Sequence, residues 1–165
     1  MAETFQVRMA TIDDLDLISQ HRARMFADMG ELPAEMFDSF RDRSLEVLKQ
    51  MFDRHQYFGW LAFPENQPDK IVAGAGVQVR EVPPHPLPDA NGKIDIVSGR
   101  QAIIQNAYTE PEWRRRGLAA LLIKRIIDWT REQRIGSVVL HASDDGRAVY
   151  QQLGFVQTNE MRLRR

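Results

Sequence analysis

Three consecutive arginines, Arg114 to Arg116, lie immediately before GLAALLIKRIIDWTREQ, a stretch with the apolar spacing of an amphipathic helix. The first turn of a helix carries partial positive charge from its unpaired backbone N–H groups, so a cation there costs about 0.3 to 1 kcal/mol. The arrangement becomes favourable if an anion such as a phosphate binds the N–H groups and the guanidinium groups together. Charge alone favours a plainer interpretation, a solvated basic run paired with Glu110 and Glu112.

The spacing around the arginines favours the anion site. Arg114-x-x-Gly117-x-Ala119 places a glycine at the helix start and a small residue two positions later, so a pyrophosphate can approach the backbone amides. The loop also follows an expected strand, AIIQNAY, as a strand–loop–helix anion site requires. Gly74-Ala-Gly76 lacks the third glycine of a dinucleotide fingerprint, and we interpret it as close backbone packing in a strand. The absence of G-x-x-x-x-G-K-[ST] argues against the usual NTPase.

Length and composition are typical of one soluble domain spanning residues 1–165. Hydrophobic residues make up 43% of the chain and charged residues 27%, which predicts a packed core. The formal net charge of -1 argues against a surface built as a whole for nucleic acid. Cysteine is absent, which excludes disulfides, thiolate metal sites and a cysteine nucleophile. Without a signal-like start or an apolar run of about 20 residues, we expect a cytoplasmic protein with no membrane partner.

Hydrophobic periodicity predicts a mixed α/β order, with a sheet that carries helices on both faces. Thr11 followed by Asp14 has the spacing of a capping box, which marks the start of the first helix. The expected elements are a strand at 5–10, helices at 11–30 and 33–52, strands at 57–63, 71–79 and 100–109, a helix at 117–133, a strand at 137–142, a short helix at 144–153 and a strand at 155–163.

The segment REVPPHPLPDANGKIDIVSG, residues 80–99, contains four prolines, and we expect it to be irregular over most of its length. Loops this long inside a compact domain are usually functional or mobile. Residues 81–99 are therefore a candidate lid over a substrate, with His85 simply exposed.

A second informative stretch is SDDGRAVYQQLGF, in which Ser143 is placed to cap a helix. Steps of three and four residues bring Ser143, Gly146 and Tyr150 onto one face. A glycine inside a helix costs about 1 kcal/mol relative to alanine, so Gly146 suggests that something lies close against this face. The alternative is a fraying helix in which Tyr150 is an ordinary half-buried aromatic residue.

Taken in order, Arg114-x-x-Gly117-x-Ala119 and Ser143-x-x-Gly146-x-x-x-Tyr150-x-x-x-Gly154-Phe155 resemble the two main motifs of the GNAT family of acetyl-CoA-dependent N-acetyltransferases. The order of expected elements is similar to that fold from Phe5 to about Leu163. The resemblance implies a mixed, mostly antiparallel sheet of about six to seven strands flanked by about four helices. It also implies direct transfer of an acetyl group from acetyl-CoA to an amine in a ternary complex, without a metal.

The resemblance further implies a role for each motif residue. The strand before the loop is splayed from its neighbour in this family and pairs with the pantetheine arm, and the loop amides bind the pyrophosphate. Tyr150 matches the tyrosine that protonates the departing CoA sulfur, and Ser143 stands where the family more often has asparagine, as a cap with a pantetheine contact. The implied cofactor-binding residues are Ala107, Tyr108 and Thr109 for pantetheine and Arg115, Arg116, Gly117, Leu118, Ala119 and Ala120 for the pyrophosphate, with Arg114 at the first motif position.

The general base is not assigned by the sequence. Members of the family often carry a glutamate on the strand before the loop, whereas residues 102–106 here, AIIQN, contain no carboxylate. His141 and Gln105 are candidates for positioning a water, and Glu31 is a candidate from the opposite side. For each of them the plain explanation, a strand end or a solvated residue, is favoured over a catalytic role.

The acceptor side of this architecture falls on MFADMGELPAEMFD, between the first two expected helices. Its carboxylates lead us to expect a small cationic amine as acceptor, with a peptide amine as the other possibility and a solvated helix junction as the plain alternative. The residues concerned are Asp28, Glu31, Glu35 and Asp38, with Met25, Met29 and Met36 as an apolar wall.

The sequence is also compatible with two other functions. One is a non-catalytic sensor or regulatory module that binds acetyl-CoA, which would not need Tyr150. The other is a nucleic-acid contact through Arg114 to Arg116 and the RLRR end, which the near-neutral charge makes the weakest, so we expect no nucleic-acid partner. The sequence leaves a homodimer open.

Overall fold

The computed structural model describes residues 4–163, apart from the side chain of Ser98. Within this range, five strands form one sheet in the order β1-β2-β3-β4-β5, antiparallel from β1 to β4 and parallel between β4 and β5. The strands are β1 (Phe5–Met9), β2 (Tyr57–Pro64), β3 (Ala73–Pro88), β4 (Ile94–Thr109) and β5 (Ser137–Leu140), and the helices are α1 (Leu15–Asp28), α2 (Phe37–Asp53), α3 (Leu118–Glu132) and α4 (Arg147–Gln152), with 3-10 turns at Ile12–Asp14, Ala34–Met36 and Pro111–Trp113.

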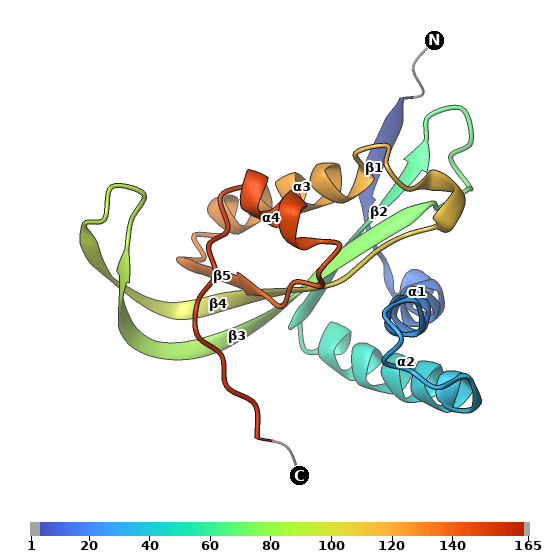
Figure 1. Cartoon of the computed structure of the whole chain (residues 1–165), viewed down its shortest axis with the longest axis horizontal. Helices are drawn as coiled ribbons and strands as arrows, with labels where there is room; N and C mark the ends of the chain where they lie inside the picture. The colour runs from blue at the N-terminus through green and yellow to red at the C-terminus, as the bar shows by residue number, and fades with distance from the viewer. Residues whose placement is uncertain (1–3, 164–165) are drawn as a thin grey trace.

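Helices cover both faces of the sheet, with α3 and α4 on one side and α1 and α2 on the other (Figure 1). Successive residues of β2 point to opposite faces, and Trp60 accordingly joins the core under α3 while Leu61 joins the core under α1 and α2. Trp60 meets Trp129 of α3 edge-on, with 5.3 Å between ring centroids. The apolar face expected for the third long helix is confirmed as buried, and it comprises Leu118, Leu122, Ile126 and Trp129.

The α/β class, the mostly antiparallel mixed sheet and the four helices are confirmed. The expected strand at 155–163 is wrong for the described residues, so that the sheet has five strands instead of six or seven. Alternating apolar residues favour a strand, but a strand needs a neighbour to pair with. Phe155 packs on Tyr150, whereas Val156, Met161 and Leu163 remain 81%, 97% and 85% exposed.

We expected the proline-rich segment to be irregular, which is wrong. It forms a two-stranded ribbon made by the end of β3 and the beginning of β4. Beyond Val79, no described strand pairs with the other side of β3, so this part of β3 is an edge. The N–H of Asp89 donates to Lys93 O at 2.8 Å, and backbone groups alternate along a strand, so the nitrogens of Pro86 and Pro88 face the free edge. Proline is tolerated there because no hydrogen bond is lost.

The ribbon extends away from the loop that precedes α3. Its tip lies where β4 begins, whereas the Pro111–Trp113 turn follows the end of β4, 16 residues further along. Figure 1 shows the two at opposite ends of the long sheet axis. A lid role for residues 81–99 thus stays a prediction that this arrangement does not favour.

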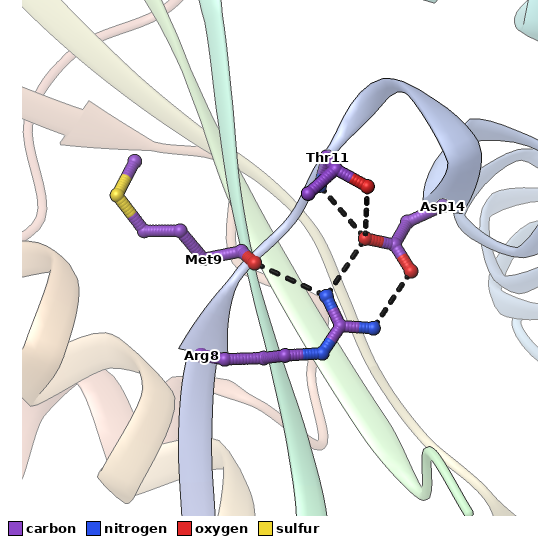
Figure 2. Close-up of polar contacts among 4 residues, drawn as sticks. All are labelled: Arg8, Met9, Thr11 and Asp14. Atoms are coloured by element: carbon purple, nitrogen blue, oxygen red, sulfur yellow. Dashed lines mark hydrogen bonds and ion pairs between the residues drawn. The ribbon is translucent and has the colours of Figure 1, made fainter. Parts of the chain in front are cut away.

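A polar cluster joins β1 to α1, as Figure 2 shows. Both oxygens of the Asp14 carboxylate accept from the Arg8 guanidinium at 2.8 Å, and one of them also accepts the backbone N–H of Thr11 at 2.7 Å. The predicted capping box is therefore formed, with aspartate in the place of the usual glutamate. The hydrogen bonds from Arg8 lower the pKa of Asp14 from its ordinary value.

We expect the Asp14→Ala substitution to lower the free energy of unfolding by about 0.5 to 2 kcal/mol at neutral pH, the usual cost of losing a helix cap. A lowered folded-state pKa stabilises the fold above the ordinary carboxyl pKa of about 4, and this contribution is lost as the pH falls through the folded-state value. Urea unfolding at pH 7 and at about pH 3 measures both effects. The control is Asp13→Ala, which removes an exposed neighbouring carboxylate. Equal losses in both variants at pH 7 would contradict the interpretation.

Candidate functional site

The last part of β4 has an outer edge without a strand partner among the described residues. β5 pairs with β4 only from Gln101 to Ile104, whereas β4 continues to Thr109. The N–H of Glu110 donates to Val72 O of the other neighbouring segment at 2.9 Å. By alternation, Tyr108 pairs its backbone with β3, and Ala107 and Thr109 point their N–H and C=O groups to the open edge.

A β-bulge precedes the open edge. The register between β3 and β4 shifts between Gly74 and Gly76, which pair with Tyr108 and Gln105, so β4 holds one residue more than β3 here. Asn106 occupies the bulge with a φ of 59°, in the left-handed region that asparagine tolerates better than most residues. The bulge bends β4 at the point where its pairing with β5 has ended.

Buried polar side chains hold the bulge. Arg22 of α1 donates from Nη1 to Asn106 Oδ1 at 2.6 Å, and Asn106 Nδ2 donates to the Tyr57 hydroxyl at 3.1 Å. Burial raises the pKa of Tyr57 to about 12, so its phenol stays neutral. A Cβ at residue 76 would lie 2.2 Å from the Tyr57 hydroxyl oxygen, so only glycine leaves room for it. Gly74-Ala-Gly76 lies in a strand as predicted, but the groups closest to its two glycines are the side chains of Leu61 and Tyr57.

A second cluster anchors the end of β4 to α1. Glu110 accepts a hydrogen bond from Arg24 Nη1 at 2.6 Å, and its Oε1 lies 3.3 Å from Nε2 of His21, without hydrogen-bond geometry. His21 is buried and its ring packs on Tyr108 at 4.9 Å, and burial lowers the pKa of this histidine. Glu110 therefore pairs with α1. The plain interpretation of the charges, which paired Glu110 with the arginine run, is wrong for this residue.

The loop from Arg114 to Gly117 turns the chain from β4 into α3. Arg115 and Gly117 have φ values of 62° and 78°, and Leu121 N–H makes the first helical hydrogen bond, to Gly117 O at 3.0 Å. The amides of residues 118–120 precede that bond and have no partner within the helix. A Cβ added at Gly117 would meet no atom within 4 Å, so space lies open beside these amides.

Two of the three arginines rest on neighbouring parts of the protein. The Arg114 guanidinium bonds to Asp28 of α1 and to Thr109 O at 3.0 Å. Arg116 donates to Glu112 O at 3.1 Å and lies over the Trp113 ring, 4.7 Å from its centroid. Arg115 is exposed. The three cations directly precede the start of α3, with Arg114 held on Asp28, Arg116 held over Trp113 and Arg115 exposed.

The second motif folds as a capped turn against a tyrosine ring. Ser143 Oγ accepts the Gly146 N–H at 3.2 Å, so the predicted capping role is confirmed. A Cβ at Gly146 would lie 2.9 Å from Cε2 of Tyr150 and 3.1 Å from Ser143 Oγ. What lies close against Gly146 is therefore the ring of Tyr150 itself. Tyr150 also packs edge-on against Phe155 at 6.0 Å, and burial raises the pKa of its hydroxyl.

The candidate bases and acceptor carboxylates are largely engaged or solvated. His141 pairs with Glu160 in an exposed position, Gln105 is half-buried and Glu31 is exposed. Asp28 is bound by Arg114, and Asp38 lies 3.1 Å from Arg41. Glu35 and Met36 are exposed too. No base is assigned by this geometry.

Among residues 4–163, no three His, Cys, Asp or Glu side chains are grouped so that they could hold a metal ion. No helix in this range is long and apolar enough to cross a membrane. The RLRR end that suggested a nucleic-acid contact runs into residues 164–165, which lie outside the described residues.

Sequence reasoning missed the residues that support the site from α1 and β2, namely His21, Arg22, Arg24 and Tyr57, and the conformation of Asn106. Arg22 and Asn106 are 84 positions apart, so no local pattern links them. An asparagine inside an apolar strand was the one available signal, since this residue type favours the left-handed region.

Comparison with known proteins gives one family and one fold. A model described as "Acetyltransferase (GNAT) family" matches residues 23–155. The chain is similar to a GCN5-related N-acetyltransferase of Ralstonia eutropha JMP134, with 29% identity, a TM-score of 0.82 and 98% of each chain covered. It is also similar to a predicted acetyltransferase with acetyl-CoA from Clostridium acetobutylicum, with 26% identity, a TM-score of 0.76 and 98% and 96% covered.

Glucosamine-6-phosphate N-acetyltransferase from Arabidopsis thaliana, at 16% identity and a TM-score of 0.64 over 99% of each chain, shares the fold. A comparison with curated proteins gives no match.

We expect Gly76→Ala to destabilise the fold by about 1 to 3 kcal/mol, as overpacking of a core does, because the new methyl group meets the Tyr57 hydroxyl. The matched control on the same strand is Gly74→Ala, where the nearest atom is the flexible Cδ2 of Leu61 at 3.0 Å. Urea unfolding of both variants gives the comparison. If Gly74→Ala is the more costly change, the close packing of residue 76 on Tyr57 is not what holds the bulge.

Proposed function

Because the chain belongs to the GNAT acetyltransferase family, we propose that it transfers the acetyl group of acetyl-CoA directly to the amine of a small molecule or peptide in a ternary complex. Two observations together support this best: the open edge at the end of β4, and the unpaired amides at the start of α3, which the chain reaches through the Pro111–Trp113 turn. The pantetheine arm of coenzyme A is an extended chain joined to a diphosphate. An open strand edge suits the extended chain, and unpaired helix amides suit the diphosphate.

Each part of the motif has a proposed task. The N–H and C=O groups of Ala107 and the N–H of Thr109 bind the pantetheine arm, and Tyr108, whose own backbone pairs with β3, supports them through its buried ring. The amides from Arg115 to Ala120 bind the pyrophosphate, and Arg114 and Arg116 hold positive charge around it. Ser143 stabilises the turn that positions Tyr150.

Tyr150 is proposed as the general acid. Acetyl-CoA supplies the acetyl group as a thioester whose leaving thiolate belongs to an acid with a pKa of about 8.5. In the transfer an N–C bond forms, the C–S bond breaks and the Tyr150 proton goes to the sulfur, while the proton that the amine loses passes through solvent and restores the Tyr150 hydroxyl. The raised pKa of Tyr150 keeps its hydroxyl protonated at neutral pH. A lysine-like amine, with a pKa of about 10.4, must first be deprotonated.

Positioning supplies much of the rate in this scheme, because holding two reactants in line is worth about 7 to 11 kcal/mol. No covalent enzyme intermediate is needed. The bulge at Asn106 bends β4 just after its pairing with β5 has ended. In this scheme the bend sets the direction of the open edge and therefore the place of the reacting groups.

We expect Tyr150→Phe to lower kcat by about 100-fold to 10,000-fold, the usual contribution of a general acid, and to leave acetyl-CoA binding unchanged. For the wild type, a raised pKa means that the acid form is lost only above the ordinary tyrosine value of about 10. Steady-state release of CoA with an amine panel, paired with calorimetric titration of acetyl-CoA, measures both. Unchanged function in the Tyr150→Phe variant would favour the sensor module instead.

We expect Arg115→Glu to weaken acetyl-CoA binding about tenfold or more at low salt, because a carboxylate then faces the diphosphate, and the difference should shrink as salt is added. The matched control is Arg134→Glu, an exposed arginine with a φ of 54° that follows the other end of α3. Calorimetric titrations compare the two variants. Equal affinities of the two variants for acetyl-CoA would contradict the proposal that the pyrophosphate binds at the start of α3.

A further inference from the structure

Arg22 is a partly buried cation without a carboxylate partner among residues 4–163. Its guanidinium donates to the neutral amide of Asn106 at 2.6 Å, and its Cζ lies 5.0 Å and 5.8 Å from the ring centroids of Phe26 and Phe40. Among the residues that the structure describes, no Asp or Glu oxygen lies within 4.0 Å of it. Burial lowers its pKa, and among nearby groups only the Tyr57 phenol opposes this effect.

Two other arginines on the same side of the sheet each have a carboxylate partner. Arg24 binds Glu110 at 2.6 Å, and Arg114 binds Asp28. Charges removed from water are normally paired, because an unpaired one is costly. A guanidinium has five N–H donors, and the hydrogen bond to Asn106 uses one of them. Arg22 therefore retains donors and an unbalanced charge.

The positive charge of Arg22 lies beside the bulge that precedes the open edge of β4. Asn106 forms the bulge directly before Ala107, at the beginning of the open edge. Under the proposed function, the thioester lies along that edge, so Arg22 reaches the reacting region from the α1 side. Two carboxylates that suggested a cationic acceptor, Asp28 and Asp38, are already paired within the protein. The charge that α1 presents at the bulge is thus positive.

We propose that the acceptor carries a carboxylate close to its amine, and that Arg22 binds this carboxylate. An α-amino acid has this arrangement, since its carboxylate and amine share one carbon. A guanidinium matches a carboxylate through two parallel hydrogen bonds. The aromatic rings of Phe26 and Phe40 hold the guanidinium in place. The inference rests on the proposed function and names its substrate class.

The first test uses the wild-type protein. The twenty common L-amino acids and the amines that result from their decarboxylation are compared as acceptors, for example phenylalanine with phenethylamine and lysine with cadaverine. We expect amino acids to be acetylated with a kcat/KM about tenfold or more above that of the matching amine, because the amine lacks a charge-assisted bond. Equal or better turnover of the amines would overturn the inference.

The second test separates substrate binding from a structural role at the bulge. Arg22→Gln should raise KM for the amino acid about tenfold or more beyond any change for the matching amine, and Arg22→Lys should partly restore this difference. Arg22→Glu should shift preference toward diamines. The control is Arg41→Gln, which removes the same charge from α2, where Asp38 and Asp42 bind it. If Arg22→Gln slows both members of a pair equally, Arg22 only supports the fold.

Acetyl-CoA binding by calorimetry separates this inference from the proposed function. Binding of acetyl-CoA without turnover of any amino acid overturns the carboxylate proposal alone. Absence of acetyl-CoA binding to the wild type overturns the proposed function. Variants that still bind acetyl-CoA are folded, and if Arg22→Gln fails to fold, the wild-type comparison decides.

Discussion

The end of pairing between β4 and β5 is the constraint on which the site depends. β5 has four residues and leaves β4 after Ile104, so the five further residues of β4 have no strand partner on that side among the residues that the structure describes. Unpaired backbone groups need water or a ligand. The segment that follows β4 leads through the Pro111–Trp113 turn to α3, whose first amides also lack a partner within the helix. A shorter β4 or a longer β5 would remove the open edge.

The bulge that accompanies this opening is supported from three other elements. Tyr57 of β2 fits only because Gly76 of β3 has no side chain, and its hydroxyl accepts from Asn106, which in turn accepts from Arg22 of α1. Buried polar groups stabilise a structure only when they are bonded to one another. A left-handed residue in mid-strand is costly, and this chain of bonds is what maintains it.

Local patterns predicted much of the fold and of the loop. The capping box of Thr11 and Asp14, the apolar face of α3 and the strand–loop–helix around Gly117 each depend on residues a few positions apart, and the structure contains all three. The face shared by Ser143, Gly146 and Tyr150 was predictable for the same reason.

What was missed depends on pairing across the chain. Pro86 and Pro88 fit into a strand because their nitrogens face a free edge, and residues 155–163 lack a strand neighbour among the described residues despite their apolar alternation. Neither outcome can be read from a segment alone. The contact between Arg22 and Asn106 joins α1 to β4 and has no local signal either.

The most direct measurement is amide hydrogen exchange of the protein, residue by residue, with and without saturating acetyl-CoA. The account predicts new protection at Ala107, Thr109 and residues 118–120, and little change at Tyr108, whose backbone already pairs with β3. Bound acetyl-CoA that leaves the amides of the open edge and of the α3 start exchanging as before would contradict it.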